Sequence, residues 1–190
     1  GLEVLKNFFN KDITFYKYDI RDEEKILGIF RTHNITSIIH FAGLKSVSQS
    51  IKNPKLYQDV NVLGSKKLFS LAKDFNVKNL IFSSSASVYG EPEYLPIDEN
   101  HKTEPISPYG QSKLDVERLL MNDSYFNKEC STKILRYFNP IGSFKEGLIG
   151  ENPKTLSDNL MPKILEVAFK FSPFINLYGD NFDTHDGSAI

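Results

Sequence analysis

The stretch Asn79-Leu80-Ile81-Phe82-Ser83-Ser84-Ser85 carries the clearest structural signal in the chain, because an apolar segment runs directly into three serines. This pattern predicts a buried strand over 80–82 whose carboxyl end carries hydroxyl groups. Downstream, Ser107-Pro108 offers a helix N-cap followed by a proline at the first helical position. Tyr109 is therefore predicted to lie in the first turn of a helix.

Tyr109 and Lys113 are four residues apart in Tyr109-Gly110-Gln111-Ser112-Lys113, a spacing that places two side chains on one face of a helix. A cation beside a phenol stabilises the phenolate and lowers a pKa that is normally about 10. The tyrosine can then act as a base near neutral pH. Taken alone, this spacing more often marks an amphipathic helix face. The serine-rich strand end favours a redox active site, in which a serine hydroxyl holds the oxygen of the substrate.

Strand-prone and helix-prone segments alternate along the rest of the chain. Further strands are predicted at 13–18, 37–41, 133–138 and 174–178, and further helices at 23–32, 54–75 and 160–169. This order is typical of an α/β fold with a doubly wound parallel sheet covered by helices on both faces. Ligands of such sheets bind beyond the carboxyl ends of the strands. Four polar residues are expected at that edge: Asp19, Lys45, Ser85 and Asn139.

The composition limits the classes of partner. With 190 residues the chain can form one sizeable core, and 23 basic against 24 acidic residues give no electrostatic footprint for nucleic acid or an anionic membrane. No apolar run is long enough to span a bilayer, and no signal peptide is recognisable. The single cysteine, Cys130, cannot form an intrachain disulfide, so a cytoplasmic location fits best. The histidines have no metal-ligand spacing, and no metal site is predicted.

Five motifs occur in order along the chain: His40-Phe41-Ala42-Gly43-Leu44-Lys45, Phe82-Ser83-Ser84-Ser85-Ala86-Ser87-Val88-Tyr89-Gly90, Ser107-Pro108-Tyr109-Gly110-Gln111-Ser112-Lys113, Leu135-Arg136-Tyr137-Phe138-Asn139-Pro140 and Asp158-Asn159-Leu160-Met161-Pro162. With these motifs the chain resembles the UDP-glucose 4-epimerases, also called UDP-galactose 4-epimerases, of the extended short-chain dehydrogenase/reductase group. The Tyr-Lys pair marks only the superfamily. The lysine after Phe-Ala-Gly-Leu and the Arg-Tyr-Phe-Asn-Pro strand end are narrower signals.

The resemblance implies a Rossmann-type fold and an incomplete chain. The family opens with a Gly-x-x-Gly-x-x-Gly turn that binds the pyrophosphate of the dinucleotide at a helix N-terminus, and no such turn occurs here. Residues 1–150 are expected to be a partial NAD-binding domain without the first βαβ unit. Residues 151–190 are expected to be the start of a smaller UDP-sugar-binding domain. The chain is interpreted as an interior piece of a longer enzyme, inactive by itself.

The resemblance also implies a reaction: reversible C4 epimerisation of UDP-glucose and UDP-galactose, a step of galactose metabolism. Hydride passes from C4 to tightly bound NAD, and the 4-keto sugar turns its other face and takes the hydride back. Tyr109 is expected to accept the proton of the C4 hydroxyl. Lys113 is expected to bind the nicotinamide ribose and to lower the pKa of the tyrosine. Ser85 is expected to bridge the substrate and Tyr109, although a turn-capping hydroxyl is the plain alternative.

Further site residues follow from the same resemblance. Cofactor contacts are expected from Tyr109, Lys113 and Ser85 and from Asp19, Ile20, Phe41, Ala42, Gly43, Lys45 and Phe138. Substrate contacts are expected from Tyr109, Ser85, Lys45, Asn139, Asn159, Leu160, Leu177 and Tyr178. Asn61 matches a position that orders the backbone of the active site. Plain alternatives stay open for three of them: Asp19 could cap the helix near Glu23, Lys45 could be a surface lysine, and Tyr178 could be a core aromatic.

Other classes of protein are alternatives to a UDP-glucose 4-epimerase. Sugar-nucleotide 4,6-dehydratases need an acidic pair just after the serine position, where this chain has Ala86-Ser87. Epimerases of UDP-glucuronate usually lack the Phe138-Asn139-Pro140 strand end. A non-enzymatic scaffold or an inert fragment stays possible, because fold does not fix function. Relatives pair as homodimers through the long helix and the Tyr-Lys helix, where four leucines could lie at the interface or face the sheet: Leu68, Leu71, Leu119 and Leu120.

Overall fold

A computed structural model describes residues 1–145, 147–150, 159–176, 179–182 and 184–187 of the chain. The chain divides into two compact units, of which one comprises residues 14–140 and the other comprises residues 1–13 together with 141–190. The boundary near residue 150 that the sequence predicts stays a prediction. The larger unit contains every candidate site residue from Asp19 to Asn139.

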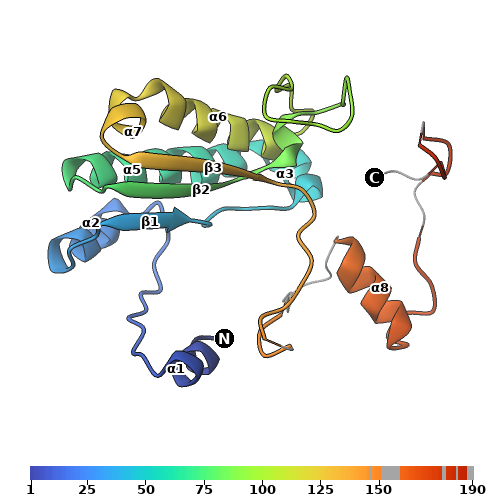
Figure 1. Cartoon of the computed structure of the whole chain (residues 1–190), viewed down its shortest axis with the longest axis horizontal. Helices are drawn as coiled ribbons and strands as arrows, with labels where there is room; N and C mark the ends of the chain where they lie inside the picture. Colours follow the sequence, from blue (N-terminus) through green and yellow to red (C-terminus); the bar gives the residue numbers. More distant parts are fainter. Residues whose placement is uncertain (146, 151–158, 177–178, 183, 188–190) are drawn as a thin grey trace. The chain divides into compact units, whose positions relative to one another are not determined.

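The larger unit is built on a parallel sheet, and its described strands follow the order β1-β2-β3 (Figure 1). The strands are β1 (Ser37–His40), β2 (Asn79–Ser85) and β3 (Ser131–Tyr137). In the register of the sheet, Ser84 of β2 lies beside Arg136 of β3. Because all three strands run in the same direction, their carboxyl ends meet at one edge, as ligand binding in such folds requires. The predicted parallel sheet is confirmed.

Helices cover one face of this sheet. The helices of the larger unit are α2 (Glu23–Thr32), α3 (Val47–Lys52), α4 (Pro54–Tyr57), the π-helical segment η1 (Gln58–Leu63), α5 (Gly64–Asp74), the 3-10 turn η2 (Ala86–Val88), α6 (Pro108–Asn122) and α7 (Ser124–Lys128). Leu80 and Phe82 of β2 are buried in a core that also contains Phe69 of α5 and Val116 of α6. Side chains alternate between the faces of a strand, so Ile39 of β1 points away from this core and is 62% exposed.

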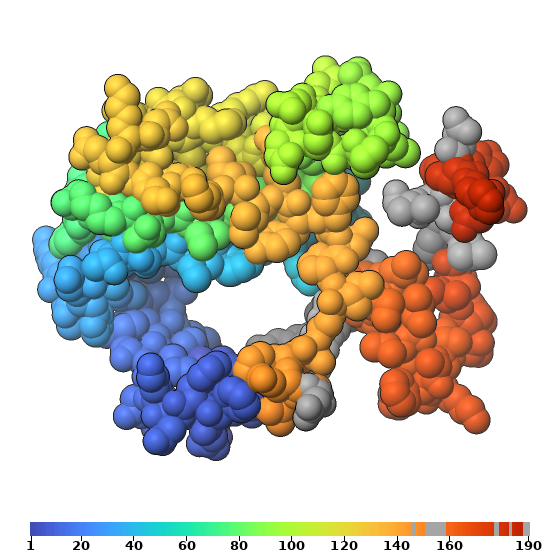
Figure 2. Space-filling view, in the orientation of Figure 1, coloured from blue at the N-terminus to red at the C-terminus, as the bar shows by residue number. Residues whose placement is uncertain are grey.

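The start of α6 follows the predicted capping pattern. The hydroxyl of Ser107 accepts a hydrogen bond from the backbone N–H of Gly110 at 3.0 Å, and Pro108 occupies the first helical position. The loop before α6 lies against the first turn of this helix (bright green beside yellow in Figure 2). It is organised by His101, whose Nε2 accepts from the N–H of Glu93 at 2.9 Å and whose Nδ1 bonds to the carbonyl of Lys102.

The strand predicted at 13–18 is wrong, and the strand predicted at 174–178 is described only in part. Residues 13–18 have a β-prone composition but form no strand, because a strand requires a hydrogen-bonded neighbour and these residues do not pair with β1. Residues 174–176 are irregular for the same reason, and Leu177 and Tyr178 lie outside the described residues. The predicted helix at 54–75 is interrupted by the π-helical segment η1.

The smaller unit contains α1 (Leu2–Phe9), α8 (Leu160–Ala168) and an antiparallel bridge between Phe144 and Ile149. An aromatic cluster joins α1 to this bridge, since the ring centroid of Phe8 lies 4.9 Å from that of Phe9 and 5.1 Å from that of Phe144. The helix predicted at 160–169 is confirmed.

The four leucines considered for a dimer interface face the core. Leu71 and Leu120 are buried, and Leu68 and Leu119 pack against the same core cluster. These side chains therefore give no support for dimerisation, which stays a prediction. Among the described helices, none has the length and apolar character needed to cross a bilayer.

Candidate active site

The loop after β1 is held by Asn61, which projects from the π-helical segment η1. Its Oδ1 accepts from the N–H of Leu44 at 2.7 Å, and its Nδ2 donates to the carbonyl of Leu44 and to the hydroxyl of Ser112, both at 3.0 Å. A Cβ at Gly43 would lie 3.0 Å from Asn61 Oδ1 and 3.9 Å from the ammonium of Lys113. The absence of a side chain at residue 43 therefore lets the loop pack closely on Asn61.

Lys113 lies beneath this loop at the carboxyl end of β2. Its side chain is buried, and its Nζ donates to the backbone carbonyl of Ser83 at 2.8 Å. The Nζ lies 5.0 Å from the ring centroid of Phe82 and 5.9 Å from that of Tyr109. Burial lowers the pKa of Lys113 to about 8, because the ammonium loses its hydration. The structure thus brings Lys113 and Tyr109 together as their spacing predicts.

Tyr109 is placed by close packing of the first turn of α6. A Cβ at Gly110 would clash with the carbonyl oxygen of Ser87 in η2, so the absence of a side chain lets α6 approach the end of β2. The ring of Tyr109 meets that of Tyr57 edge to face, with centroids 6.4 Å apart. Tyr57 donates its hydroxyl proton to the carbonyl of Ser46 at 2.6 Å, and burial raises its pKa. Tyr57 therefore forms a structural wall beside Tyr109.

Ser85 ends β2 and caps η2. Its hydroxyl accepts from the N–H of Ser87 at 3.2 Å and bonds to the hydroxyl of Ser87 at 3.2 Å. This geometry matches the turn-capping alternative that the sequence leaves open, so a contact between Ser85 and the substrate stays a prediction. The neighbouring Ser84 is buried on the α6 side of the sheet, where it donates to Glu117.

Asp19 and Ile20 lie near the junction of η1 and α5. The carboxylate of Asp19 accepts from the backbone N–H, Nε and Nη2 of Arg21 at 2.9, 2.9 and 2.8 Å, and these bonds hold its pKa well below its usual range. Arg21 also binds Asp59 of η1 at 2.7 Å. The helix cap of α2 is Asp22, so the capping alternative for Asp19 is wrong. The side chain of Ile20 fits against Gly64, where a Cβ would lie 2.8 Å from it.

The other candidate residues of the larger unit form an exposed rim at the strand ends. Phe41 and Phe138 are 61% and 58% exposed, and Ala42, Lys45 and Asn139 are exposed as well. Exposed rings at this edge could cover an apolar ring of a bound cofactor. Asn159 and Leu160 begin α8 in the smaller unit, and the remaining two candidates, Leu177 and Tyr178, lie outside the described residues.

Two buried polar residues near the site, Glu117 and His40, were not predicted from the sequence as site residues. Glu117 of α6 is fully buried in an ion pair with Arg136 of β3. His40 of β1 is also buried, and the loss of hydration together with the charge of Lys113 lowers its pKa to about 4. The only sequence signal was the position of Glu117, one turn after Lys113 on the same helix face.

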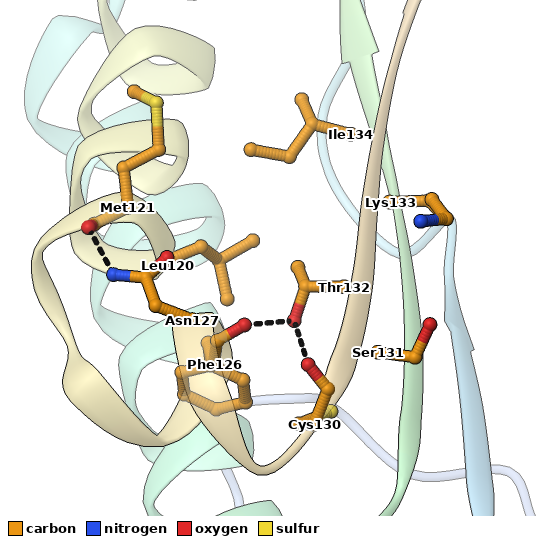
Figure 3. Close-up of a pocket in the computed structure, with 9 residues that line it drawn as sticks. All are labelled: Leu120, Met121, Phe126, Asn127, Cys130, Ser131, Thr132, Lys133 and Ile134. Carbon is orange, nitrogen blue, oxygen red and sulfur yellow. Dashed lines mark hydrogen bonds between the residues drawn. The ribbon is translucent and has the colours of Figure 1, made fainter.

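A pocket of about 410 Å³ lies away from these residues, at the amino end of β3 (Figure 3). Leu120, Thr132 and Ile134 point into it, and the hydroxyl of Thr132 donates to the carbonyl of Phe126 at 2.9 Å. Tyr109 and Lys113 are absent from its lining. No group of three or more potential metal ligands occurs in the described part of the chain. The candidate chemistry is therefore confined to the carboxyl ends of the strands.

Comparison with known proteins places this geometry in a family. A family model described as "GDP-mannose 4,6 dehydratase" matches residues 2–179. The chain belongs to the GDP-mannose 4,6 dehydratase family. Within this family, the chain is 39% identical over 191 aligned residues to the UDP-glucose 4-epimerase of Bos taurus, covering 100% of the chain and 55% of that relative. The resemblance to UDP-glucose 4-epimerases is confirmed.

Solved structures of UDP-glucose 4-epimerases share the fold of this chain. The UDP-glucose 4-epimerase of Stenotrophomonas maltophila, with bound NAD and formylated UDP-arabinopyranose, has a TM-score of 0.91 and 39% identity over 98% of this chain and 55% of that chain. The enzyme of Bifidobacterium longum, in complex with NAD⁺ and UDP, has a TM-score of 0.91 and 41% identity over 98% and 56%. The Rossmann-type fold is confirmed, and the chain spans about half the length of these relatives.

Proposed function

We propose that the full-length protein interconverts UDP-glucose and UDP-galactose by epimerisation at C4, with NAD as its cofactor. The observation that carries this proposal is the position of Lys113, buried between the carbonyl of Ser83 and the rings of Phe82 and Tyr109. A buried cation beside a phenol is the arrangement that makes a tyrosine a base. The relatives of this chain that carry the name UDP-glucose 4-epimerase support the choice of reaction.

The residues at the strand ends fit a dinucleotide. Gly43 lets the loop after β1 pack closely on Asn61 beside Lys113, and the exposed rings of Phe41 and Phe138 offer apolar surface to a nicotinamide. The Nζ of Lys113 has three donors, of which the carbonyl of Ser83 takes one, so others remain for a ribose hydroxyl. NAD, when bound, supplies the acceptor for the hydride of C4. Phe41, Gly43, Lys113 and Phe138 would hold it.

The protein's own groups would move the proton and hold the sugar. The phenolate oxygen of Tyr109 would take the proton of the C4 hydroxyl and later return it to the same oxygen, once the configuration of C4 is inverted. Lys113 would stabilise the phenolate by its charge. The hydroxyl of Ser85 would turn from its contact with Ser87 to the oxygen on C4, and Asn139 would bind the diphosphate or the sugar.

Dehydration of a sugar nucleotide is the second candidate, favoured by the description of the matched family model. That reaction needs an acid to protonate the leaving hydroxyl. Ala86 and Ser87, which follow the serine strand end, carry no carboxyl group. Analysis of the product distinguishes the two reactions, because epimerisation gives a stereoisomer of the substrate and dehydration gives a deoxy ketone.

The replacement Tyr109→Phe in the full-length protein tests the proposed reaction. The variant keeps the ring that meets Tyr57 but lacks the base, so we expect NAD to stay bound and conversion of UDP-galactose to fall by at least about 10²-fold, the usual contribution of a general base. Conversion is measured by chromatographic separation of the two UDP-sugars.

Tyr125→Phe is the matched control for this experiment. Its hydroxyl bonds to the carbonyl of Val77, at the opposite end of β2, so the same chemical change there should lower stability but preserve turnover. Undiminished conversion by the Tyr109 variant would rule out Tyr109 as the base.

A further inference from the structure

We propose that Glu117 and Arg136 form a positioning pair, which fixes α6 against β2 and β3 so that Lys113 and Tyr109 meet the residues that follow the strands. The inference rests on the proposed function for its catalytic consequence. It assigns a role to two residues that take no part in the proposed reaction.

The pair has a geometry that fixes both distance and angle. Glu117 Oε1 accepts from Nε of Arg136 at 3.0 Å, and Oε2 accepts from Nη2 at 2.7 Å. The hydroxyl of Ser84 donates to Oε1 of the same carboxylate. Glu117 is fully buried, and the side chain of Arg136 is only 18% exposed. A planar guanidinium that grips both oxygens of a carboxylate allows little rotation or sliding between the two elements.

Glu117 and Ser84, the serine that donates to it, are each connected by a short piece of backbone to a candidate catalytic group. Glu117 lies one helical turn beyond Lys113 on α6. Ser84 lies between Ser83, whose carbonyl accepts from Lys113, and Ser85. A shift of α6 along β2 would therefore break the pair and move the ammonium of Lys113 at the same time.

Arg136 extends this arrangement toward the rim of the site. Its guanidinium lies 4.8 Å from the ring centroid of Tyr89, which is buried. The ring of Tyr89 in turn lies 6.3 Å from that of Phe138, two residues after Arg136, and 5.6 Å from that of His101. The guanidinium is thus held between the carboxylate of Glu117 and an aromatic face, which fixes the end of β3 and the Phe138 rim.

Burial of an ion pair usually adds little net stability. The cost of removing both charges from water is about as large as their attraction, so apolar residues of similar volume often replace such a pair without loss of stability. Apolar residues cannot reproduce the directional grip of the two oxygens. Replacing both partners together should therefore lower turnover but leave stability nearly unchanged.

The double replacement Glu117→Leu with Arg136→Met in the full-length protein tests the inference. We expect a melting temperature within a few degrees of that of the wild type, a kcat at least about tenfold lower and a KM for UDP-galactose changed less than about threefold. Lys73→Met is the control, because it breaks an exposed pair with Asp123 at 3.2 Å, and it should keep the wild-type kcat. Wild-type kcat in the double variant would overturn the proposal.

A second readout does not depend on turnover. The pKa of Lys113 is measured by reductive methylation over a range of pH, and we expect it to rise in the double variant from about 8 toward the ordinary value of lysine as the ammonium leaves its buried position. An unchanged pKa would overturn the positioning role. If the wild-type protein shows no epimerase activity but the pKa still rises, the proposed function fails and the positioning pair stands. If the double variant does not fold, Arg136→Lys, which keeps the charge without the fork, carries both measurements.

Discussion

Lys113 and Glu117 lie one turn apart on α6, and the structure buries each of them by a different means. Lys113 loses its hydration beside a carbonyl and two rings, so its pKa falls to about 8. Glu117 is buried together with its counterion, Arg136. The cation is thereby left with donors that can serve a ligand, whereas the carboxylate is committed to holding the fold together. One face of α6 therefore carries both the candidate ligand-binding cation, Lys113, and the carboxylate of Glu117, which fixes the helix.

His40 gives rise to a prediction about acid stability. Its Nε2 lies 2.8 Å from the hydroxyl of Ser65, which donates to the carbonyl of Asn61, so Nε2 is the donor to Ser65. Burial keeps the imidazole neutral at pH 7. The unfolded chain takes up a proton near pH 6.5, but the folded chain takes it up only near pH 4. The folded state therefore loses stability as the pH falls from about 6.5 to 4, and loses no more below that range.

The measurement is urea unfolding of the full-length protein at pH 7.5 and pH 5.0. We expect the wild type to lose about 2 kcal/mol more between these pH values than His40→Gln, which keeps a donor but cannot titrate. Lys113, whose pKa is about 8, is present in both proteins, so its small contribution near pH 7.5 cancels in the comparison. Equal losses in the two proteins would show that His40 does not resist protonation.

At the scale of residues, the sequence predicted that Tyr109 and Lys113 lie together, but it did not predict the buried pair that holds α6 in place. The proximity of Tyr109 and Lys113 follows from helical spacing, which is a local property. An acidic residue on a helix normally faces water, so nothing in the sequence indicates that Glu117 is buried. Its partner, Arg136, is 19 residues away on another element, and only the tertiary register of α6 against β3 brings the two together.

At the scale of elements, local signals predicted the helices well and the strands less well. The helix over 23–32 is as predicted, because its apolar spacing is regular and an aspartate precedes it. The strand over 13–18 failed, because aromatic and β-branched residues favour a strand only where a neighbour supplies hydrogen bonds. The ends of α6 and β2 were predicted from capping and serine patterns, but their close contact depends on Gly110.

Two glycine replacements test this contact. A Cβ at Gly110 would clash with the carbonyl of Ser87, so Gly110→Ala should destabilise the full-length protein by about 1–3 kcal/mol and reduce turnover, because Tyr109 is the adjacent residue. Gly28 in α2 has no atom within 4 Å of an added Cβ, and Gly28→Ala should stabilise the protein by about 0.5–1 kcal/mol through better helix propensity. Urea unfolding measures both. Equal stabilities of the two variants would contradict the packing of α6 on η2.

At the scale of the whole molecule, the candidate site residues from Asp19 to Asn139 lie in the larger unit. The chain that carries Tyr109, Lys113 and the exposed rim spans about half the length of the related enzymes. Apolar residues on the face of the sheet opposite α5 and α6, such as Ile39 and Leu135, are exposed in the 190 residues. The surface that would surround a dinucleotide is therefore larger than the part that these residues supply.

This partial surface leads to a prediction about cofactor binding. The printed residues contain no Gly-x-x-Gly-x-x-Gly turn, which is the feature that binds a pyrophosphate at a helix N-terminus. A polypeptide of these 190 residues alone should therefore lose NAD during purification, whereas the full-length protein should retain it. Enzymatic assay of NAD released by acid measures both. Stoichiometric NAD in the shorter polypeptide would contradict the expectation.

The π-helical segment Gln58–Leu63 sets the angular phase between the two halves of the helix that runs from Pro54 to Asp74. One residue added to an α-helix rotates everything beyond it by about 100°. Asn61 can therefore aim at the loop after β1 while Phe69, further along, aims at the core. In an uninterrupted α-helix, one rotation of the helix about its axis could not satisfy both contacts. The wide turn removes that conflict.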